Sequence, residues 1–552
     1  MDRHHEATIA RRACALVTVC LVMLVTARLA RAQAYDAAPI ATSLAIDVPC
    51  TAEAAAEVQR GASLLFFAMH DPALLAFDRA AELDPACALA GWGQAVALAR
   101  LPAYDTSTAT VARGRAALAR AAAATNGSAR DRRLIGATQA LFDAGTVSAA
   151  LRLKVFGDGM HGLAHAEPAH VLALGSAVLA DLARTTLPDD DPVRSARDRI
   201  AHAFPDPGAM PVEIAFLRLL VADDAAAETV AIATRLEAMS TPTPATAHAA
   251  VRVFYRTGRW EDAAQAGEMA ARIAGGWFAP SMVTPLAWMG PVPDWGMAAM
   301  AQRGRHEAMA SVVRACPAAE AEAVTSLDAT LAPRVASACL RTTIRAWFAD
   351  IDWQSATSVP EPPRAAEGAV PDAEATAMAL LARGLHLARA AWPRGERDLV
   401  AGARVVMAEL EALAAAHPAG ARAIELDRLL VAMALAGAFE SRDELLVYEL
   451  QAGDLERMLD VSRQHLPRLA GVNRVAGELH LRLHDYREAH EHFARALARQ
   501  PNDARALLGL ARAAARLGDG AASRDAAQRF LATWSGADRS RREVVEALKL
   551  AK

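Results

Sequence analysis

Histidines four residues apart are the side chains in this sequence whose spacing best suits metal chemistry. One such pair, His161 and His165, stands in the segment "MHGLAHAEPAH". On a helix this spacing places two imidazoles on one face, as a zinc ion requires. The pair has no glutamate between its members, unlike the H-E-x-x-H motif, and no third ligand can be assigned to it. Ordinary histidines on a helix surface are the alternative explanation.

A second pair, His480 and His484 in "HLRLH", is followed by His490 and His492. These histidines fall along and just after a predicted helix. Packing and hydrogen bonds between helices explain them without a metal ion. The sequence therefore predicts no metal site here.

No motif in the sequence predicts catalysis. The chain has no G-x-S-x-G elbow, no phosphate-binding G-x-x-x-x-G-K-[ST], no G-x-G-x-x-G after a predicted strand and no C-x-x-C. The net charge of −4 comes without a basic patch, so nucleic acid is not an expected partner. We therefore expect no catalytic residues, no cofactor and no enzymatic activity.

The composition predicts the helices that position these side chains. Hydrophobic residues make up 53% of the chain and aromatic residues only 5%, and alanine supplies much of the apolar total. Alanine is the strongest helix former and lets helix axes approach one another closely. Alanine- and leucine-rich runs at 378–391, 401–416 and 421–437 show a helical period without the alternation of a strand.

Two distant segments share one packing pattern, "ALLAFDRAAELDPACALAGWG" at 73–93 and "AHEHFARALARQPNDARALLG" at 489–509. In each, small residues let two helices cross closely, a phenylalanine fills the space beside the crossing, and a proline ends the second helix. Gly258 marks the turn of a third such unit. The matching positions are Ala73, Phe77, Ala80 and Pro85 in the first segment with Gly61 before it, and Ala489, Phe493, Ala496 and Pro501 in the second with Gly477 before it.

This spacing resembles the tetratricopeptide repeat, whose helix pairs recur about every 34 residues. We predict an all-α fold, a right-handed superhelix in two segments. An N-terminal array over 33–354 and a C-terminal array over 376–552 are expected, joined by a proline-rich linker at 355–375.

Such arrays expose a long concave groove lined by the first helix of each pair. In the C-terminal unit Arg474, Glu478 and Arg482 are expected to face this groove. A protein or peptide partner is the natural occupant, because the groove offers an extended surface rather than a deep pocket.

The N-terminus has the pattern of an export signal. Arg11 and Arg12 precede an uncharged run of about 15 residues, shorter than the roughly 20 that a membrane-spanning helix needs. The small residues Ala30 and Ala32 suit signal peptidase, so we predict a signal peptide over 1–32 with cleavage after Ala32. The mature protein would then be periplasmic or secreted and have no transmembrane span. An uncleaved N-terminal anchor is the alternative.

Four cysteines remain after this cleavage, and an even number in an exported chain permits disulfides. Cys50 and Cys87 lie just before the first and at the start of the third expected helix, which could bring them together. Cys316 and Cys339 are the second candidate pair. Four buried thiols are the alternative.

The opening block also resembles one family of tetratricopeptide proteins that bacteria export. Cys50 and the following "RGASLLFFAMHDPALLAFDRAAELDPACALAGWGQAVAL" look like that family's first helix pair and its D-P-x-C-A…W-G turn. The resemblance spans roughly 45–275. Members of the family carry a histidine-rich set, and such a set suits a first-row metal.

This chain departs from the family's histidine pattern. In "DPGAMPVEIAFLR" and "HAAVRVFYRTG" only His248 survives, and the other matching positions are Asp206, Pro211, Ala215, Arg218 and Arg252. The resemblance therefore implies a scaffold without most of the metal ligands.

We expect an exported, non-enzymatic scaffold that binds a protein or peptide through its groove. The alternative is a metal- or cofactor-dependent periplasmic protein that uses His161, His165 or His248.

Overall fold

The computed structural model contains only helices as regular elements within the described part of the chain, which confirms the predicted all-α fold. No helix in that part is long and apolar enough to cross a membrane. The expected signal peptide, 1–32, lies outside the described residues, as does most of 355–375. The described residues are 43–102, 104–143, 145, 148–168, 170–184, 192–221, 227–277, 292–324, 331–350, 371–392, 396–460, 468–537 and 539–552.

The chain forms two compact units. Unit 1 comprises Met1–Ala249 and Ile273–Met282, and unit 2 comprises Ala250–Arg272 and Val283–Lys552. The division runs through two helices, α12 (Pro244–Arg256) and α13 (Trp260–Trp277).

The sequence placed the division at 355–375 instead, and the structure shows why this position differs. Phe348 of α17 (Leu331–Asp350) and Met378 of α18 (Ala373–Ala390) belong to one hydrophobic core. Helices on both sides of the proline-rich segment therefore pack within unit 2.

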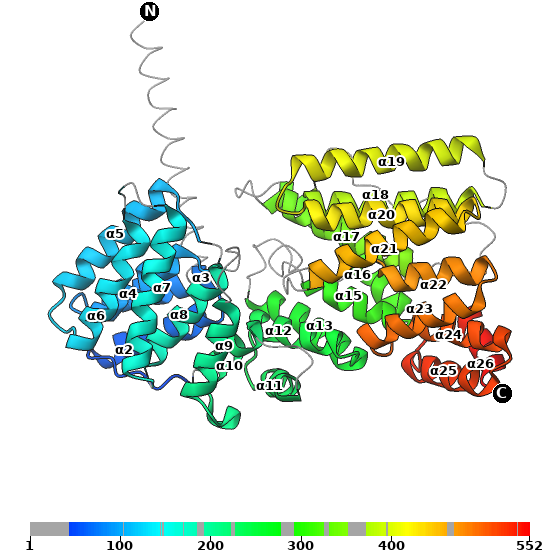
Figure 1. The fold of residues 1–552 in the computed structure, drawn as a ribbon. Coiled ribbons are helices and arrows are strands. Elements are labelled where there is room, and N and C mark those ends of the chain that lie inside the picture. The colour runs from blue at the N-terminus through cyan, green and yellow to red at the C-terminus, as the bar shows by residue number, and fades with distance from the viewer. Residues whose placement is uncertain are drawn as a thin grey trace, which may run out of the picture. The chain divides into compact units, whose positions relative to one another are not determined.

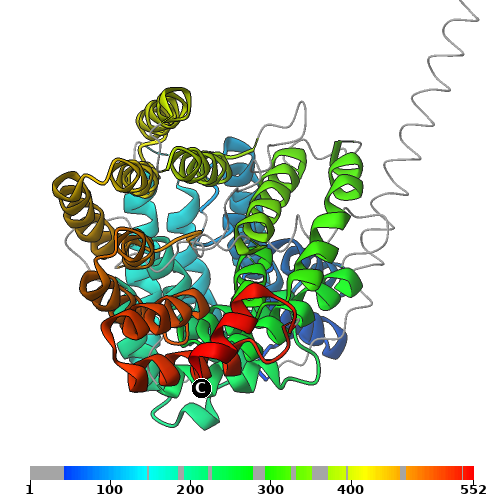
Figure 2. The ribbon, with the colours of Figure 1, turned by 90° about the vertical axis from the view of Figure 1, so that its right-hand side faces the viewer.

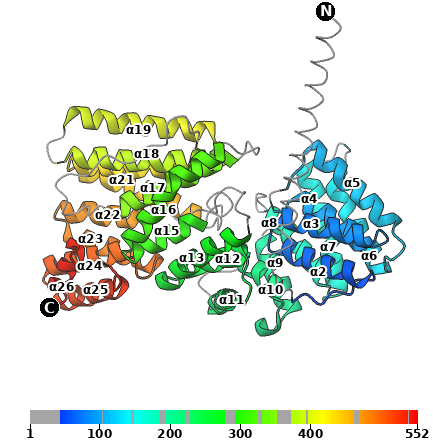
Figure 3. The same ribbon diagram turned by 180° about the vertical axis from the view of Figure 1, so that it is seen from behind.

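Unit 1 is built from helices that pack in consecutive pairs, such as α2 with α3, α4 with α5 and α7 with α8 (Figure 3). Side chains that bind the first free amides start several of them, with Ser128 and Asp131 forming a reciprocal capping box at α6. The helices are α2 (Ala52–Phe66), α3 (His70–Leu83), α4 (Ala88–Ala99), α5 (Thr108–Ala123), α6 (Ala129–Thr138), the 3₁₀ turn η1 (Gln139–Phe142), α7 (Ala149–Ala166), α8 (Val171–Ala183), α9 (Pro192–Ala203), the 3₁₀ turn η2 (Pro207–Ala209), α10 (Val212–Leu220) and α11 (Ala227–Glu237).

The first repeat block packs around Phe77, which is fully buried. A Cβ atom added to Gly61 of α2 would lie 2.8 Å from the Phe77 ring, and one added to Gly93 of α4 would lie 2.2 Å from it. The ring therefore fills the space that two glycines leave on neighbouring helices. Trp92 meets the same ring edge-on and donates its indole N–H to the Thr138 hydroxyl at 3.1 Å.

The structure joins Cys50 and Cys87 in a disulfide, as expected from their places beside α2 and α4. Cys316 and Cys339 are not bridged. They are buried thiols that contact each other between α16 (His306–Val324) and α17, within a small apolar core. The second expected disulfide is thus replaced by the alternative, two thiols that pack as small apolar side chains.

Unit 2 stacks helix pairs in sequence, and from α18 to α26 these pairs follow one another in Figure 1. The first helices of successive pairs, α18, α20, α22 and α24, contact each other, and Figure 2 shows the pairs along a curved path from yellow to red. Besides α16, α17 and α18, the helices are α15 (Val292–Gln302), α19 (Arg397–Ala416), α20 (Ala421–Ala438), α21 (Arg442–Asp460), α22 (Val472–Arg482), α23 (Tyr486–Arg499), α24 (Ala504–Leu517), α25 (Gly520–Thr533) and α26 (Arg542–Leu550).

Phe493 in unit 2 occupies the same setting as Phe77 in unit 1. It is fully buried, and a Cβ atom added to Gly477 of α22 or Gly509 of α24 would lie 2.9 or 2.3 Å from its ring. The helices before the two prolines also end alike, at Leu83 and at Arg499. The packing read from the sequence is therefore the packing of the structure at these positions.

Several turns between paired helices contain a residue with positive φ. This left-handed conformation reverses the chain while satisfying the last carbonyl groups of the first helix. Three of these residues are glycines and four are not. They are Ala68, Arg100, Gly258, Gly304, Glu440, His484 and Gly518.

Candidate functional site

A pocket opens in unit 2 against α22, and we call it the α22 pocket. It is a small, partly open pocket of about 50 Å³ between the first helices of successive pairs. Most of its lining is apolar, with three charged side chains among it. The lining residues are Phe348, Leu385, Ala388, Arg389, Trp392, Ala434, Val475, Glu478, Leu479 and Arg482.

The charged side chains give the α22 pocket a positive balance. The Arg482 guanidinium lies over the Trp392 ring, 4.3 Å from its centroid. Burial and the nearby Arg389 lower the pKa of Arg482 to about 10, and Glu478 opposes this shift. Burial raises the pKa of Glu478 while Arg474 lowers it. Two guanidinium groups therefore face one carboxyl group in a partly desolvated site.

Two of the three residues expected to face the groove, Glu478 and Arg482, line this pocket. The third, Arg474, lies two turns earlier on α22. Its guanidinium stands 5.7 Å from the centroid of the Phe348 ring and donates to the Leu469 carbonyl oxygen at 2.6 Å. Arg474 thus supports a lining side chain rather than lining the pocket itself.

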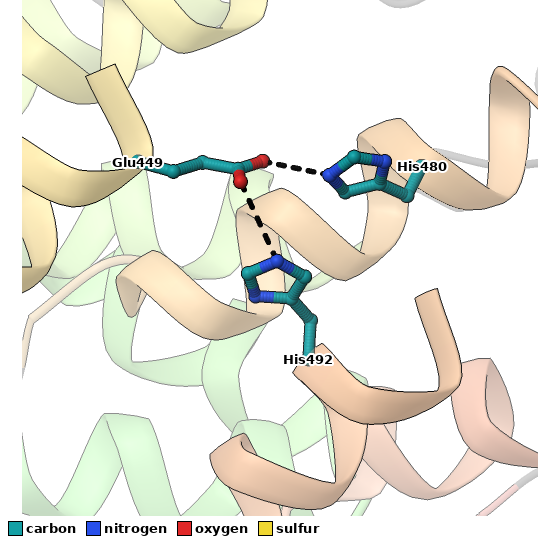
Figure 4. A group of neighbouring side chains, drawn as sticks. All are labelled: Glu449, His480 and His492. Carbon is teal, nitrogen blue, oxygen red and sulfur yellow. Dashed lines mark hydrogen bonds and ion pairs between the residues drawn. The ribbon is translucent and has the colours of Figure 1, made fainter. Parts of the chain in front are cut away.

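Unit 2 also gathers Glu449, His480 and His492, which we call the His480 cluster (Figure 4). Glu449 comes from α21, His480 from α22 and His492 from α23. The Nε2 atom of His480 lies 2.9 Å from Glu449 Oε1, and the Nε2 atom of His492 lies 3.5 Å from Glu449 Oε2. The two imidazole rings are stacked, with centroids 5.3 Å apart.

The cluster shifts the pKa values of its members. Burial would raise the pKa of Glu449, but hydrogen bonds from His480 and His492 outweigh burial and hold that pKa at about 2. Burial would lower the pKa of His480, but Glu449 and Asp485 outweigh it and raise that pKa. The cluster therefore stabilises positive charge on or between its nitrogen atoms.

The other histidines considered from the sequence lie elsewhere. The Nε2 atom of His161 pairs with Asp181 at 3.1 Å, whereas His165 is exposed. His248 is half-buried on α12. The Nδ1 atom of His484 shares a hydrogen bond of 2.7 Å with the Tyr486 hydroxyl group. Within the described residues, only Glu449, His480 and His492 form a group of three side chains placed for a metal ion.

Sequence reasoning missed the partners that complete both sites. Trp392 follows the end of α18, Phe348 belongs to α17, and Glu449 lies 31 residues before His480. No local motif connects these residues, because stacking of successive helix pairs brings them together. The repeat itself was the one feature of the sequence that could have pointed to these partners, because the second helix of one repeat packs beside the next repeat.

The comparisons with known proteins support the repeat. Residues 474–538, which run from the first turn of α22 to just beyond α25, match the family model of the tetratricopeptide repeat. A comparison with curated protein sequences gave no match.

Solved structures matched over most of their length include the human IFIT1 dimer with PPP-AAAA, at 11% identity and a TM-score of 0.30, covering 90% of this chain and 96% of that one. The human IFIT1 dimer with m7Gppp-AAAA matches at 13% identity and a TM-score of 0.31, over 90% and 97%. The APC/C hetero-tetramer Cut9-Hcn1 matches at 12% identity and a TM-score of 0.23, over 90% and 96%. Such distant likenesses say nothing about what this chain binds.

The tetratricopeptide prediction is thus confirmed for 474–538. This stretch carries Glu478 and Arg482 of the α22 pocket and both histidines of the His480 cluster. Arrays of this kind are interaction scaffolds whose concave surfaces receive other proteins.

Proposed function

We propose that this protein is an exported, non-enzymatic scaffold that holds a peptide segment of a partner protein in the α22 pocket. The observation that carries the proposal is the placement of this pocket on the first helices of consecutive repeat pairs, lined by the stacked side chains of Trp392 and Arg482. That surface is the one through which helical-repeat arrays bind extended ligands.

The lining predicts the chemistry of the bound segment. Phe348, Trp392 and Leu479 offer apolar surface for one large side chain. Arg389 and Arg482 lie beside it and favour a carboxylate, since guanidinium groups bind carboxylates through charge-assisted hydrogen bonds. We therefore expect a peptide in which an acidic side chain or a terminal carboxylate neighbours an apolar residue.

Export of the chain is part of the proposal. The charged start, the apolar run and the small residues Ala30 and Ala32 support secretion with cleavage after Ala32. Expression of the full chain in a bacterium, followed by N-terminal sequencing of the periplasmic fraction, tests this step. A mature protein that begins at Gln33 is the expected result, and an uncleaved cytoplasmic chain would contradict it.

Selection from a displayed peptide library tests the binding step. The purified chain is expected to enrich peptides that combine a carboxylate with an apolar residue. Their affinity, measured by fluorescence anisotropy, should fall at least about tenfold in Arg482→Glu and in Trp392→Ala, because each removes one of the two kinds of contact.

Arg487→Glu is the matched control, since Arg487 is exposed on α23 of the same repeat. It makes the same charge reversal outside the pocket and should bind like the unaltered chain. Equal loss in Arg487→Glu and Arg482→Glu would point to nonspecific attraction between charges. Undiminished binding by both pocket variants would reject the α22 pocket as the site.

A further inference from the structure

We propose that the His480 cluster is a zinc site that joins two consecutive helix pairs. Glu449 belongs to the pair α20 and α21, whereas His480 and His492 belong to the pair α22 and α23. Two imidazole nitrogens and one carboxylate oxygen form a donor set that zinc accepts, with water in the fourth position. Imidazole ligands favour zinc over magnesium or calcium, which prefer oxygen.

The outer contacts of the two rings fix which nitrogen faces Glu449. The Nδ1 atom of His492 lies 3.1 Å from Asn473 Oδ1, and this oxygen also accepts from Arg495 Nε at 3.3 Å. The Nδ1 atom of His480 lies 3.6 Å from Asp485 Oδ2. The Asn473 oxygen therefore accepts the hydrogen of His492 Nδ1, and the Asp485 carboxylate, just beyond hydrogen-bond distance, favours a hydrogen on His480 Nδ1 through its charge.

This arrangement leaves both Nε2 atoms directed at the Glu449 carboxylate. In neutral imidazoles those atoms would present lone pairs to an anion, which is repulsive. A cation or protons must therefore lie among the three groups. A ring N–H held by an acceptor, as Asn473 holds that of His492, is the outer contact that orients histidines on zinc in proteins.

The spacing of the ligand atoms suits a small cation. Nitrogen and oxygen ligands at 2.0–2.1 Å from a tetrahedral zinc ion lie about 3.3 Å apart. The two distances from Nε2 to carboxylate oxygen, 2.9 and 3.5 Å, bracket this separation. All three ligand atoms lie within 4.8 Å of one another, so small side-chain rotations would complete the geometry.

The position of the cluster would place the ion between two helix pairs, with its fourth position open to water. Glu478 and Arg482 line the α22 pocket from one face of α22, and His480 lies on the opposite face toward α21 and α23. A zinc ion would thus hold adjacent pairs at a fixed spacing without entering the pocket. The proposal stands on its own contacts and does not rest on peptide binding.

Metal titration of the full purified chain tests the site. The chain is stripped with a chelator and titrated with Zn²⁺ against a chromophoric competitor, and with Co²⁺ while visible absorption is recorded. We expect one ion per chain and the strong cobalt absorption of a four-coordinate site. His480→Ala and His492→Ala should each weaken zinc binding by more than about 100-fold, since each loses a ligand.

His484→Ala is the matched control, because His484 lies one helical turn from His480 but pairs with Tyr486 instead. It should bind zinc like the unaltered chain. Glu449→Gln keeps the size of the side chain and provides a second ligand variant if a histidine variant does not fold. Asn473→Ala should weaken binding about 10- to 100-fold through the ring that it orients.

Equal zinc affinity in the unaltered chain and in Glu449→Gln, His480→Ala and His492→Ala would overturn the proposal. So would ¹⁵N spectra in which both rings stay doubly protonated when zinc is present. Either result would assign the cluster to two imidazolium groups paired with Glu449.

Discussion

The first repeat block, α2 to α4, and the block at α22 to α24 share their packing and differ in the bonds and sites found outside that packing. In both, a buried phenylalanine fills the space left by one glycine on its own helix pair and another on the next pair. The two sets are Gly61, Phe77 and Gly93 in unit 1 and Gly477, Phe493 and Gly509 in unit 2.

The features that differ between the two blocks lie outside this shared core. Unit 1 adds the disulfide between Cys50 and Cys87 and the hydrogen bond from Trp92 to Thr138. Unit 2 adds the His480 cluster and the α22 pocket. One packing pattern can therefore support a cross-linked block and a block equipped for binding, because the core uses only part of each helix surface.

The largest expected effect comes from removing the shared ring. Phe77→Ala and Phe493→Ala should each lower the free energy of unfolding of their own block by about 3–5 kcal/mol, because each leaves a cavity between helix pairs. Hydrogen exchange measured by mass spectrometry would locate the loss to α2–α4 or to α22–α24. Phe439→Ala is the control, because Phe439 is 48% exposed and its removal should change stability by less than about 0.5 kcal/mol. If one variant lowered the stability of both blocks equally, the result would contradict the view that each block packs independently of the other.

The next largest effect, loss of the disulfide, should destabilise only one of the two blocks. Replacing both Cys50 and Cys87 by alanine should destabilise α2–α4 by about 3–4 kcal/mol, since the bond closes a loop over a sequence separation of 37. Reducing agent should have the same effect on the unaltered chain and leave α22–α24 unchanged. The free thiols Cys316 and Cys339 make the control pair, since their replacement by alanine should not alter the response to reductant. A response in unit 2 of similar size would mean that the bond does not distinguish the blocks.

A smaller effect depends on pH and involves one histidine in each unit. Burial, reinforced by Arg100, lowers the pKa of His70 to about 4, and burial with Arg541 lowers the pKa of His306 to about 4. The unfolded chain binds a proton near pH 6.5, so stability is complete above that value and falls as pH drops toward 4. The loss should approach about 2–3 kcal/mol for each histidine.

The variant His70→Gln tests whether this pH dependence in unit 1 comes from His70. The variant should flatten the decline between pH 6.5 and 4 in unit 1 and leave the decline of unit 2 unchanged. Denaturant unfolding followed by hydrogen exchange at several pH values would measure both. A decline in unit 1 that persists in His70→Gln would assign it to other groups.

The core of this fold could be predicted from sequence because its signals are local. Gly477, Phe493 and Pro501 stand at fixed separations within one repeat, so helix geometry alone relates them. The candidate sites could be predicted only in part for the opposite reason. Glu478 and Arg482 follow from the face of one helix, but Trp392 and Arg389 come from an earlier pair.

The histidines also show that sequence spacing does not reveal partners on other helices. Their i, i+4 spacing suggested that His480 belongs with His484, yet the turn after α22 directs His484 to Tyr486. His480 instead meets His492 and Glu449, which lie on other helices. Composition did not indicate that Phe348 and Met378, on either side of the proline-rich segment, share a core. Position along the chain identifies neighbours within a repeat and not between repeats.

The smallest expected effect concerns the turn that both blocks share. Ala68 has φ of 57° and His484 has φ of 63°, at matching places between the paired helices. This conformation costs a residue with a Cβ atom about 1–2 kcal/mol. Glycine adopts it without that cost but loses more conformational entropy on folding. Ala68→Gly and His484→Gly should therefore stabilise their blocks by about 0.5–1 kcal/mol.

Gly518→Ala provides the reverse test, since Gly518 ends α24 with φ of 80° and no atom lies within 4 Å of an added Cβ. It should destabilise by about 1 kcal/mol through backbone strain alone. Thermal unfolding of the three variants measures both signs. Destabilisation by Ala68→Gly would mean that contacts of its methyl group outweigh the strain, and the turns of the two blocks would then differ in how they are held.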